Sequence, residues 1–137
     1  GDLGDFICED TFRNAYLNIT TETNFITEDV HITEKSFKPF FFYQIPIFLS
    51  SAFHVKNLKE IYGFDLFEDV VNHDYDNETN FKKRFSLVCD EINRIYNNRD
   101  EIKKFIINNK ERFLKNNEIV SNIINDRTDY NYFESLI

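Results

Sequence analysis

A short apolar run, Ile45–Leu49, indicates the fold class of this chain more strongly than any other segment. A continuous apolar run of this length is typical of a strand buried on both faces, as in a parallel sheet. Residues 15–20 place aliphatic side chains at every second position, which predicts an earlier strand. The connection between the two strands is long enough for a right-handed parallel crossover that contains a helix. We therefore expect an α/β protein with a small parallel sheet, a Rossmann-like half, flanked by helices.

The crossover is expected to contain a helix that begins near Thr33, whose hydroxyl is suited to an N-cap. Three phenylalanines within residues 37–42 follow at helical spacing. Pro39 lies inside this segment and is expected to kink the helix or to tighten its first turn. The aromatic side chains of residues 37–42 are expected in the core.

A second helix is predicted over His54–Tyr62, where apolar side chains recur on one helical face. Gly63 is suited to the left-handed conformation that ends many helices, and Phe64 is suited to pack back against the helix. We expect residues 64–67 to form a brief third strand.

The rest of the chain has the period of amphipathic helices. Residues 80–96 form the clearest helix, and further helical segments are predicted over 99–114 and 118–124. The length of 137 residues fits one domain that can bury its own core. Its expected parts are an α/β core over 1–76, a helical extension over 77–125 and a tail over 126–137.

Composition argues against several classes of protein. There are three glycines and two prolines, and neither GxGxxG nor GxxxxGK[ST] occurs, so a glycine-rich phosphate loop is not expected. With a net charge of −8, the chain is not expected to have the positive surface that binding to a nucleic-acid backbone requires. We therefore expect no nucleic-acid partner. No apolar run is long enough for a membrane span, and we expect no signal peptide. Cys8 and Cys89 lie far apart, so we expect reduced thiols and a cytoplasmic location.

The start of the chain predicts a longer protein. The chain contains no methionine, and position 1 is Gly1. Two or three strands would also make a thin sheet. We therefore expect a C-terminal piece whose N-terminal domain, with further strands, is missing here.

Polar side chains gather at two places that a parallel crossover brings to one edge of the sheet. Glu22 follows the first strand, and the next helix opens with Thr33, Glu34 and Lys35. A helix N-terminus offers unpaired N–H groups and a partial positive charge, to which Lys35 and Lys38 would add. Together with carboxylates that accept hydrogen bonds from hydroxyls, this set suits a nucleotide sugar. The alternative is that Thr33 only caps the helix, Glu34 only complements its dipole, and the lysines are solvated.

The segments AYLNITTETNF (15–25) and HITEKSFKPFFFYQIPIFLSS (31–51) resemble the nucleotide-sugar-binding, C-terminal half of two-domain glycosyltransferases with the GT-B architecture. The resemblance is to the fucosyltransferase family, in which a strand with a short Glu-containing motif precedes a Thr-Glu-Lys helix start and a (V/I)P(V/I) strand. The wider string over 16–76 looks like a group of phage and marine-microbial proteins.

This resemblance implies roles for individual residues. Glu34 would lie near the nucleotide ribose, Lys35 would contact the diphosphate, and Glu22 would match the acidic position after the first strand. Arg13 lies before that strand, where a phosphate-binding arginine would sit. The implied activity is sugar transfer from a nucleoside diphosphate with no cofactor, and the leaving diphosphate is stabilised by preorganised charge. The catalytic base would come from an acceptor-binding domain, so no catalytic residue is assigned.

Other candidate residues carry weaker predictions. His31, His54 and His73 show no metal-ligand spacing and are expected on the surface or in packing. Residues 74–78 alternate acidic side chains as calcium loops do, but they lack the required glycine and final glutamate. A solvated loop that caps the next helix is the alternative that we favour. Ser50 has no nucleophile-elbow glycines around it, which argues against a hydrolase.

A second class of function stays open at this stage. The same fold can serve as a non-catalytic interaction module in a viral or microbial assembly. Binding of a nucleoside diphosphate distinguishes the two hypotheses.

Overall fold

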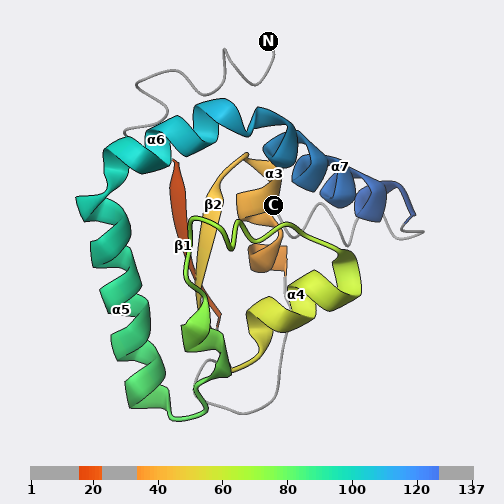
Figure 1. Cartoon of the computed structure of the whole chain (residues 1–137). Coiled ribbons are helices and arrows are strands. Elements are labelled where there is room, and N and C mark those ends of the chain that lie inside the picture. The colour runs from red at the N-terminus through yellow and green to blue at the C-terminus, as the bar shows by residue number, and fades with distance from the viewer. Residues whose placement is uncertain (1–15, 23–33, 127–137) are drawn as a thin grey trace.

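The structure is a computed structural model that describes residues 16–22 and 34–126 (Figure 1). The predicted α/β class is confirmed, because a two-stranded parallel sheet packs with helices and the C-terminal part is mostly helical. The elements are, in chain order, β1 (Leu17–Thr21), the 3-10 helix η1 (Glu34–Ser36), α3 (Lys38–Phe41), β2 (Ile45–Leu49), α4 (His54–Tyr62), the 3-10 helix η2 (Asp74–Asn77), α5 (Phe81–Asn97), α6 (Arg99–Asn108) and α7 (Lys110–Asp126).

β1 and β2 pair in parallel, as predicted, with Leu17 opposite Ile45 and Thr21 opposite Leu49. β2 coincides with the apolar run, and the first four of its residues are buried. Both α3 and α5 contact β2 and cover it. A continuous apolar sequence therefore suits β2, since neither of its faces meets water.

The segment predicted as one helix from residue 33 forms two short turns, η1 and α3. Pro39 lies in the first turn of α3, where its missing N–H costs no helical hydrogen bond. Phe40 is fully buried and stacks on Phe64 with ring centroids 3.9 Å apart. Phe42 is 40% exposed, so its predicted core position is wrong. The backbone reverses at the next residue, Tyr43, where φ is 58°.

α4 begins and ends where the sequence predicted. Gly63 takes the left-handed conformation with φ 77°, and its N–H donates to the carbonyl oxygen of Lys59 at 2.9 Å. Phe64 is buried and lies 5.9 Å from the ring of Tyr62. The left-handed glycine and the hydrophobic contact after it are both confirmed.

The predicted third strand over 64–67 is wrong, because these residues form no strand. Side chains take the place of a neighbouring strand as hydrogen-bond acceptors. The Asp65 amide donates to Asn116 Oδ1, and the Phe67 amide donates to Asp65 Oδ1, both at 2.9 Å. Phe67 has φ 55°, which no strand residue adopts.

α5 matches the helix predicted over 80–96, and Asn80 caps it by accepting the Lys83 amide. Phe85 fits the apolar period of this helix but is 46% exposed. The first turns of α5 extend past the ends of the strands (Figure 1).

The two helical segments predicted after α5 have a different boundary. The break falls at Asn109, between α6 and α7, and α7 contains all of 118–124. The Asn109 side chain donates to the carbonyl oxygen of Phe105 at 2.8 Å, and its backbone N–H donates to Ile106. A polar side chain that bonds to the preceding turn competes with continued helix, which explains the break.

α5, α6 and α7 form an arc around the sheet, from α5 alongside the strands to α7 next to α3 (Figure 1). Asn117 joins α7 to α3 by donating to the carbonyl oxygen of Phe41 at 2.7 Å. This arc encloses a phenylalanine-rich core and leaves the carboxyl ends of the strands to other segments. No helix among the described residues has the length and apolar character needed to cross a membrane.

Candidate functional site

Buried polar side chains gather at the carboxyl edge of the parallel pair. Glu22 follows β1, Ser50 and Ser51 follow β2, Ser36 ends η1, and His54 begins α4. Each of these five side chains is almost completely buried. Buried polar groups are costly unless they bond to one another, so their hydrogen bonds define this edge.

A hydrogen-bond chain connects three of these residues. The Ser36 hydroxyl donates to Glu22 Oε1 at 2.6 Å and lies 2.7 Å from His54 Nε2. A serine has one proton, which is directed to the carboxylate, so the imidazole donates from Nε2. This order differs from a nucleophilic triad, in which histidine accepts the serine proton. These hydrogen bonds therefore fix η1, β1 and α4 relative to one another and do not activate Ser36.

The structure brings together part of the predicted ligand site. Glu22 is buried and bonded to Ser36, so the end of β1 and η1 do lie side by side. Lys35 is exposed, while Glu34 and Lys38 are half-buried. η1 and α3 are each shorter than two helical turns, so neither has the macrodipole of the longer helix that was predicted. Arg13 and Thr33 lie outside the described residues, as do Cys8 and His31.

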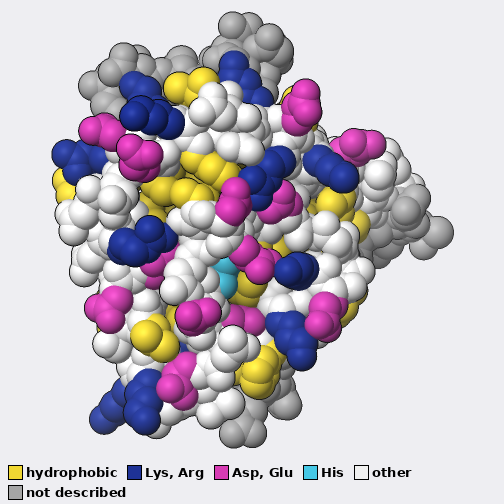
Figure 2. All heavy atoms as spheres, viewed as in Figure 1, with side chains coloured by type: hydrophobic (Ala, Val, Ile, Leu, Met, Phe, Trp, Pro, Cys, Tyr) yellow, Lys and Arg dark blue, Asp and Glu magenta, His cyan; other side chains and the backbone are white. Residues whose placement is uncertain are grey.

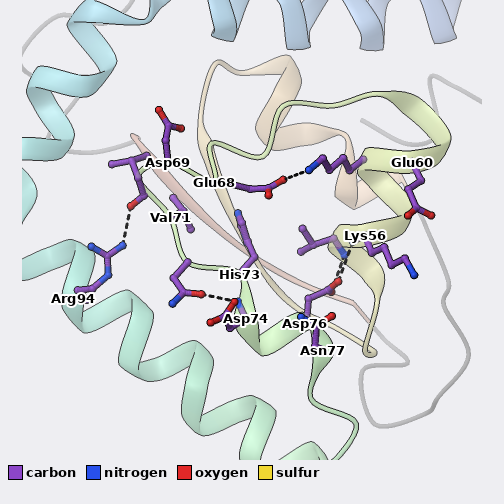
Figure 3. A pocket seen from close by; sticks show the side chains of 14 residues that line it. Lys56, Glu60, Glu68, Asp69, Val71, His73, Asp74, Asp76, Asn77 and Arg94 are labelled. Carbon is purple, nitrogen blue, oxygen red and sulfur yellow. Dashed lines mark hydrogen bonds and ion pairs between the residues drawn. The ribbon is translucent and has the colours of Figure 1, made fainter.

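A polar groove of about 650 Å³ lies beside α4, and the sequence did not predict it (Figure 3). Its walls are α4 and residues 68–77, and Arg94 of α5 closes one end. Figure 2 shows acidic and basic side chains around a histidine near the middle of this face. The only sequence signal for the groove was the acidic pattern at 74–78.

Asp76 caps the N-terminus of α4 from the groove. Its Oδ1 accepts the Val55 amide at 2.8 Å, its Oδ2 accepts the Lys56 amide at 2.9 Å, and its carbonyl oxygen accepts the Phe53 amide at 2.7 Å. Asp76 is 5% exposed, so the prediction of a solvated loop is wrong for this residue, whereas Asp74 is exposed as predicted. Burial raises the pKa of the Asp76 carboxyl, and the hydrogen bonds from the amides oppose that rise. A carboxylate thus already occupies the anion position of α4.

His73 is held deep in the groove by two hydrogen bonds. Its Nε2 lies 2.8 Å from the carbonyl oxygen of Leu66, and its Nδ1 lies 2.8 Å from the Tyr75 hydroxyl. The carbonyl can only accept, so Nε2 carries the proton and Nδ1 accepts from Tyr75. The same hydroxyl accepts the Phe48 amide of β2 at 3.1 Å. Burial lowers the pKa of His73 and raises that of Tyr75, so both groups are neutral.

Ion pairs engage most of the cations in and around the groove. Lys59 bridges from α4 to Glu68 at 2.8 Å, across the groove. Arg94 pairs with Glu91 at 2.6 Å and also donates to the carbonyl oxygen of Val70. Arg112, outside the groove, holds Asp69 and lowers the pKa of that carboxyl. Acidic side chains outnumber basic ones along the lining.

Among the described residues, no group of three His, Cys, Asp or Glu side chains is placed to hold a metal ion. Asp74 and Glu78 are not placed together with Asp76 in such a group. The Asp74 amide donates to Asn72, and Glu78 accepts the Asn80 amide.

Fold and site together define a small α/β protein whose polar side chains cluster around the start of α4. No protein-family model, curated protein or solved structure matches the chain.

Proposed function

We propose that this chain is the donor-binding domain of a glycosyltransferase and binds a nucleoside-diphosphate sugar at the carboxyl edge of β1 and β2. The observation that carries the proposal is the 2.6 Å hydrogen bond from Ser36 to Glu22. It keeps η1, which contains Glu34 and Lys35, beside the end of β1. In open α/β sheets, ligands bind outside the carboxyl ends of the strands.

In this proposal, the residues of the edge contact different parts of the ligand. Lys35 presents an exposed ammonium group, which suits a diphosphate oxygen. The Glu34 carboxylate is half-buried and suits the ribose hydroxyls, and Lys38 supplies a second positive charge nearby. Glu22 acts by positioning η1, because its carboxylate is buried and accepts a hydrogen bond from the Ser36 hydroxyl. Arg13 keeps its predicted role as a phosphate contact.

Electrostatics favour the edge over the groove as the diphosphate site. The groove is lined by five carboxylates and three basic side chains, and carboxylates repel phosphate oxygens. Lys59 is already paired with Glu68. The N-terminus of α4, another positive feature there, is occupied by Asp76.

Titration calorimetry of the folded chain with GDP and UDP tests the proposal. We expect one of the two to bind, and Lys35→Ala to weaken that binding by roughly 1–3 kcal/mol, the range of charge-assisted hydrogen bonds. Lys115→Ala is the matched control, since Lys115 is an exposed lysine on α7, and we expect unchanged affinity. The chain should bind without turnover, because transfer needs an acceptor domain.

Two results would contradict the proposal. Absence of heat with both nucleotides at millimolar concentration would favour the interaction module instead. Equal affinity of the Lys35→Ala and Lys115→Ala variants would remove Lys35 from the site and with it the argument from η1.

A further inference from the structure

We propose that the outer edge of β1 pairs with the same edge of a second copy of this chain. The two β1 strands would run antiparallel and form a four-stranded sheet in the order β2–β1–β1–β2. This inference rests on the backbone of the sheet and is independent of nucleotide binding.

The hydrogen-bond pattern shows which way each β1 residue points. The Tyr16 carbonyl oxygen accepts the Ile45 amide at 3.0 Å, and the Glu22 amide donates to the Leu49 carbonyl oxygen at 3.1 Å. Peptide groups alternate in direction along a strand, so residues 16, 18, 20 and 22 face β2. The peptide groups of Leu17, Ile19 and Thr21 therefore point away from β2. In the part of the chain that the structure describes, these outward groups make no hydrogen bond.

The outer edge of β2 differs from that of β1, because it is closed to further pairing. Pro46 has no N–H to donate, and the Phe48 amide donates to the buried Tyr75 hydroxyl at 3.1 Å. Proline and covered amides are common ways in which proteins protect a sheet edge. β1, with the sequence LNITT, contains neither a proline nor a charged side chain.

Two of the five β1 side chains are also accessible to a partner. Ile19 is 47% exposed and Thr21 is exposed, whereas Ile47, opposite Ile19 on β2, is fully buried. A sheet of two strands is marginal by itself, and added strands stabilise it. An exposed, uncharged edge with an apolar side chain at its centre is a template for strand addition.

A second copy of β1 fits this edge under two-fold symmetry. With a two-fold axis at Ile19, this residue lies opposite its own counterpart, and Leu17 lies opposite Thr21. Every outward N–H and C=O of both strands then finds a partner in antiparallel hydrogen-bonded pairs. A closed two-fold contact uses the same patch on both copies. Although each chain carries a net charge of −8, the uncharged LNITT segment brings no like charges opposite each other.

Sedimentation equilibrium of the full chain tests the pairing. We expect a mass twice the 16.5 kDa of one chain. Ile19→Lys places charges next to each other at the two-fold axis, so it should give the single-chain mass. Ile61→Lys is the matched control, because Ile61 is 61% exposed on α4 and away from the edge, and it should remain dimeric.

A second variant and a second measurement distinguish pairing from misfolding. Ile19→Pro removes the outward N–H, which makes no bond within the chain, so the variant should keep its far-ultraviolet circular dichroism and lose the dimer. Amide exchange at Leu17, Ile19 and Thr21 should be slower in the wild type than in Ile19→Lys by at least about tenfold. A single-chain mass for the wild type, or a dimer that survives both changes at Ile19, would overturn the proposal.

Discussion

The two ends of α4 are held in different ways. At the C-terminal end, the adjacent Gly63 adopts φ 77° and donates its N–H to Lys59 of the last turn. At the N-terminal end, the adjacent Phe53 also has positive φ, 68°, but its side chain makes no cap. The cap comes instead from Asp76, which lies 21 positions beyond Val55, whose amide it accepts.

This difference determines what each end contributes to the fold. A local cap affects one turn of helix, and its loss leaves the surroundings intact. A distant cap also joins elements, because Asp76 fastens η2 to α4 and Tyr75 fastens η2 to β2 through the Phe48 amide. Damage to the distant cap should therefore cost more than damage to the local one.

The largest expected effect is that of Asp76→Ala. It leaves the Val55 and Lys56 amides without their buried acceptor, which should lower the free energy of unfolding by about 2–3 kcal/mol. Urea denaturation followed by circular dichroism measures the change. Asp74→Ala, an exposed acid two residues earlier, is the control and should stay within about 0.5 kcal/mol of wild type. Equal effects of the two changes on the free energy of unfolding would mean that the distant cap stabilises the fold no more than an exposed acid does.

The parts of the fold that could be predicted are those whose signals lie in adjacent residues. β2 is one unbroken apolar run, and α4 has its period and its terminal Gly63 in one stretch of sequence. The failures depend on distant partners. Residues 64–67 are apolar like a strand, but Asn116 of α7 accepts the Asp65 amide and no strand is present to pair with. Phe85 fits the helical period, but it is 46% exposed in the fold.

The candidate site divides in the same way. The prediction that a parallel crossover brings Glu22 near the start of the next helical segment is correct. It gave no sign of Ser36 or His54 as the groups that bond there, since a serine and a histidine 18 positions apart form no pattern. The sequence predicts Asp76 as a solvated acid, because its acceptor role depends on amides at the start of α4.

A smaller effect is expected from the protonation of His73, which supports the distant cap indirectly. Burial lowers its pKa below the usual 6.5, so the unfolded chain binds this proton more readily than the folded chain. The free energy of unfolding should therefore fall as the pH drops below about 6.5, by no more than about 1.4 kcal/mol per pH unit for this group. A protonated Nδ1 also cannot accept the Tyr75 hydroxyl. Urea denaturation between pH 7 and 5 should show a shallower fall in His73→Gln, and identical profiles would exclude His73 as the cause.

The smallest effect tests the local end of α4. Apart from the two neighbouring residues, no atom lies within 4 Å of the position that a Cβ would take at Gly63. Gly63→Ala therefore meets no steric clash there, and its cost is the strain of φ 77°. That strain is about 1–2 kcal/mol for an L-residue, and asparagine tolerates the left-handed region better than alanine. Urea denaturation should thus rank the wild type above Gly63→Asn, and Gly63→Asn above Gly63→Ala. The amides at the other end of α4 should keep their slow hydrogen exchange in both variants, because Asp76 holds them independently of Gly63. If Gly63→Ala costs as much as Asp76→Ala, or releases the Val55 amide, then the two ends are coupled and the contrast between them fails.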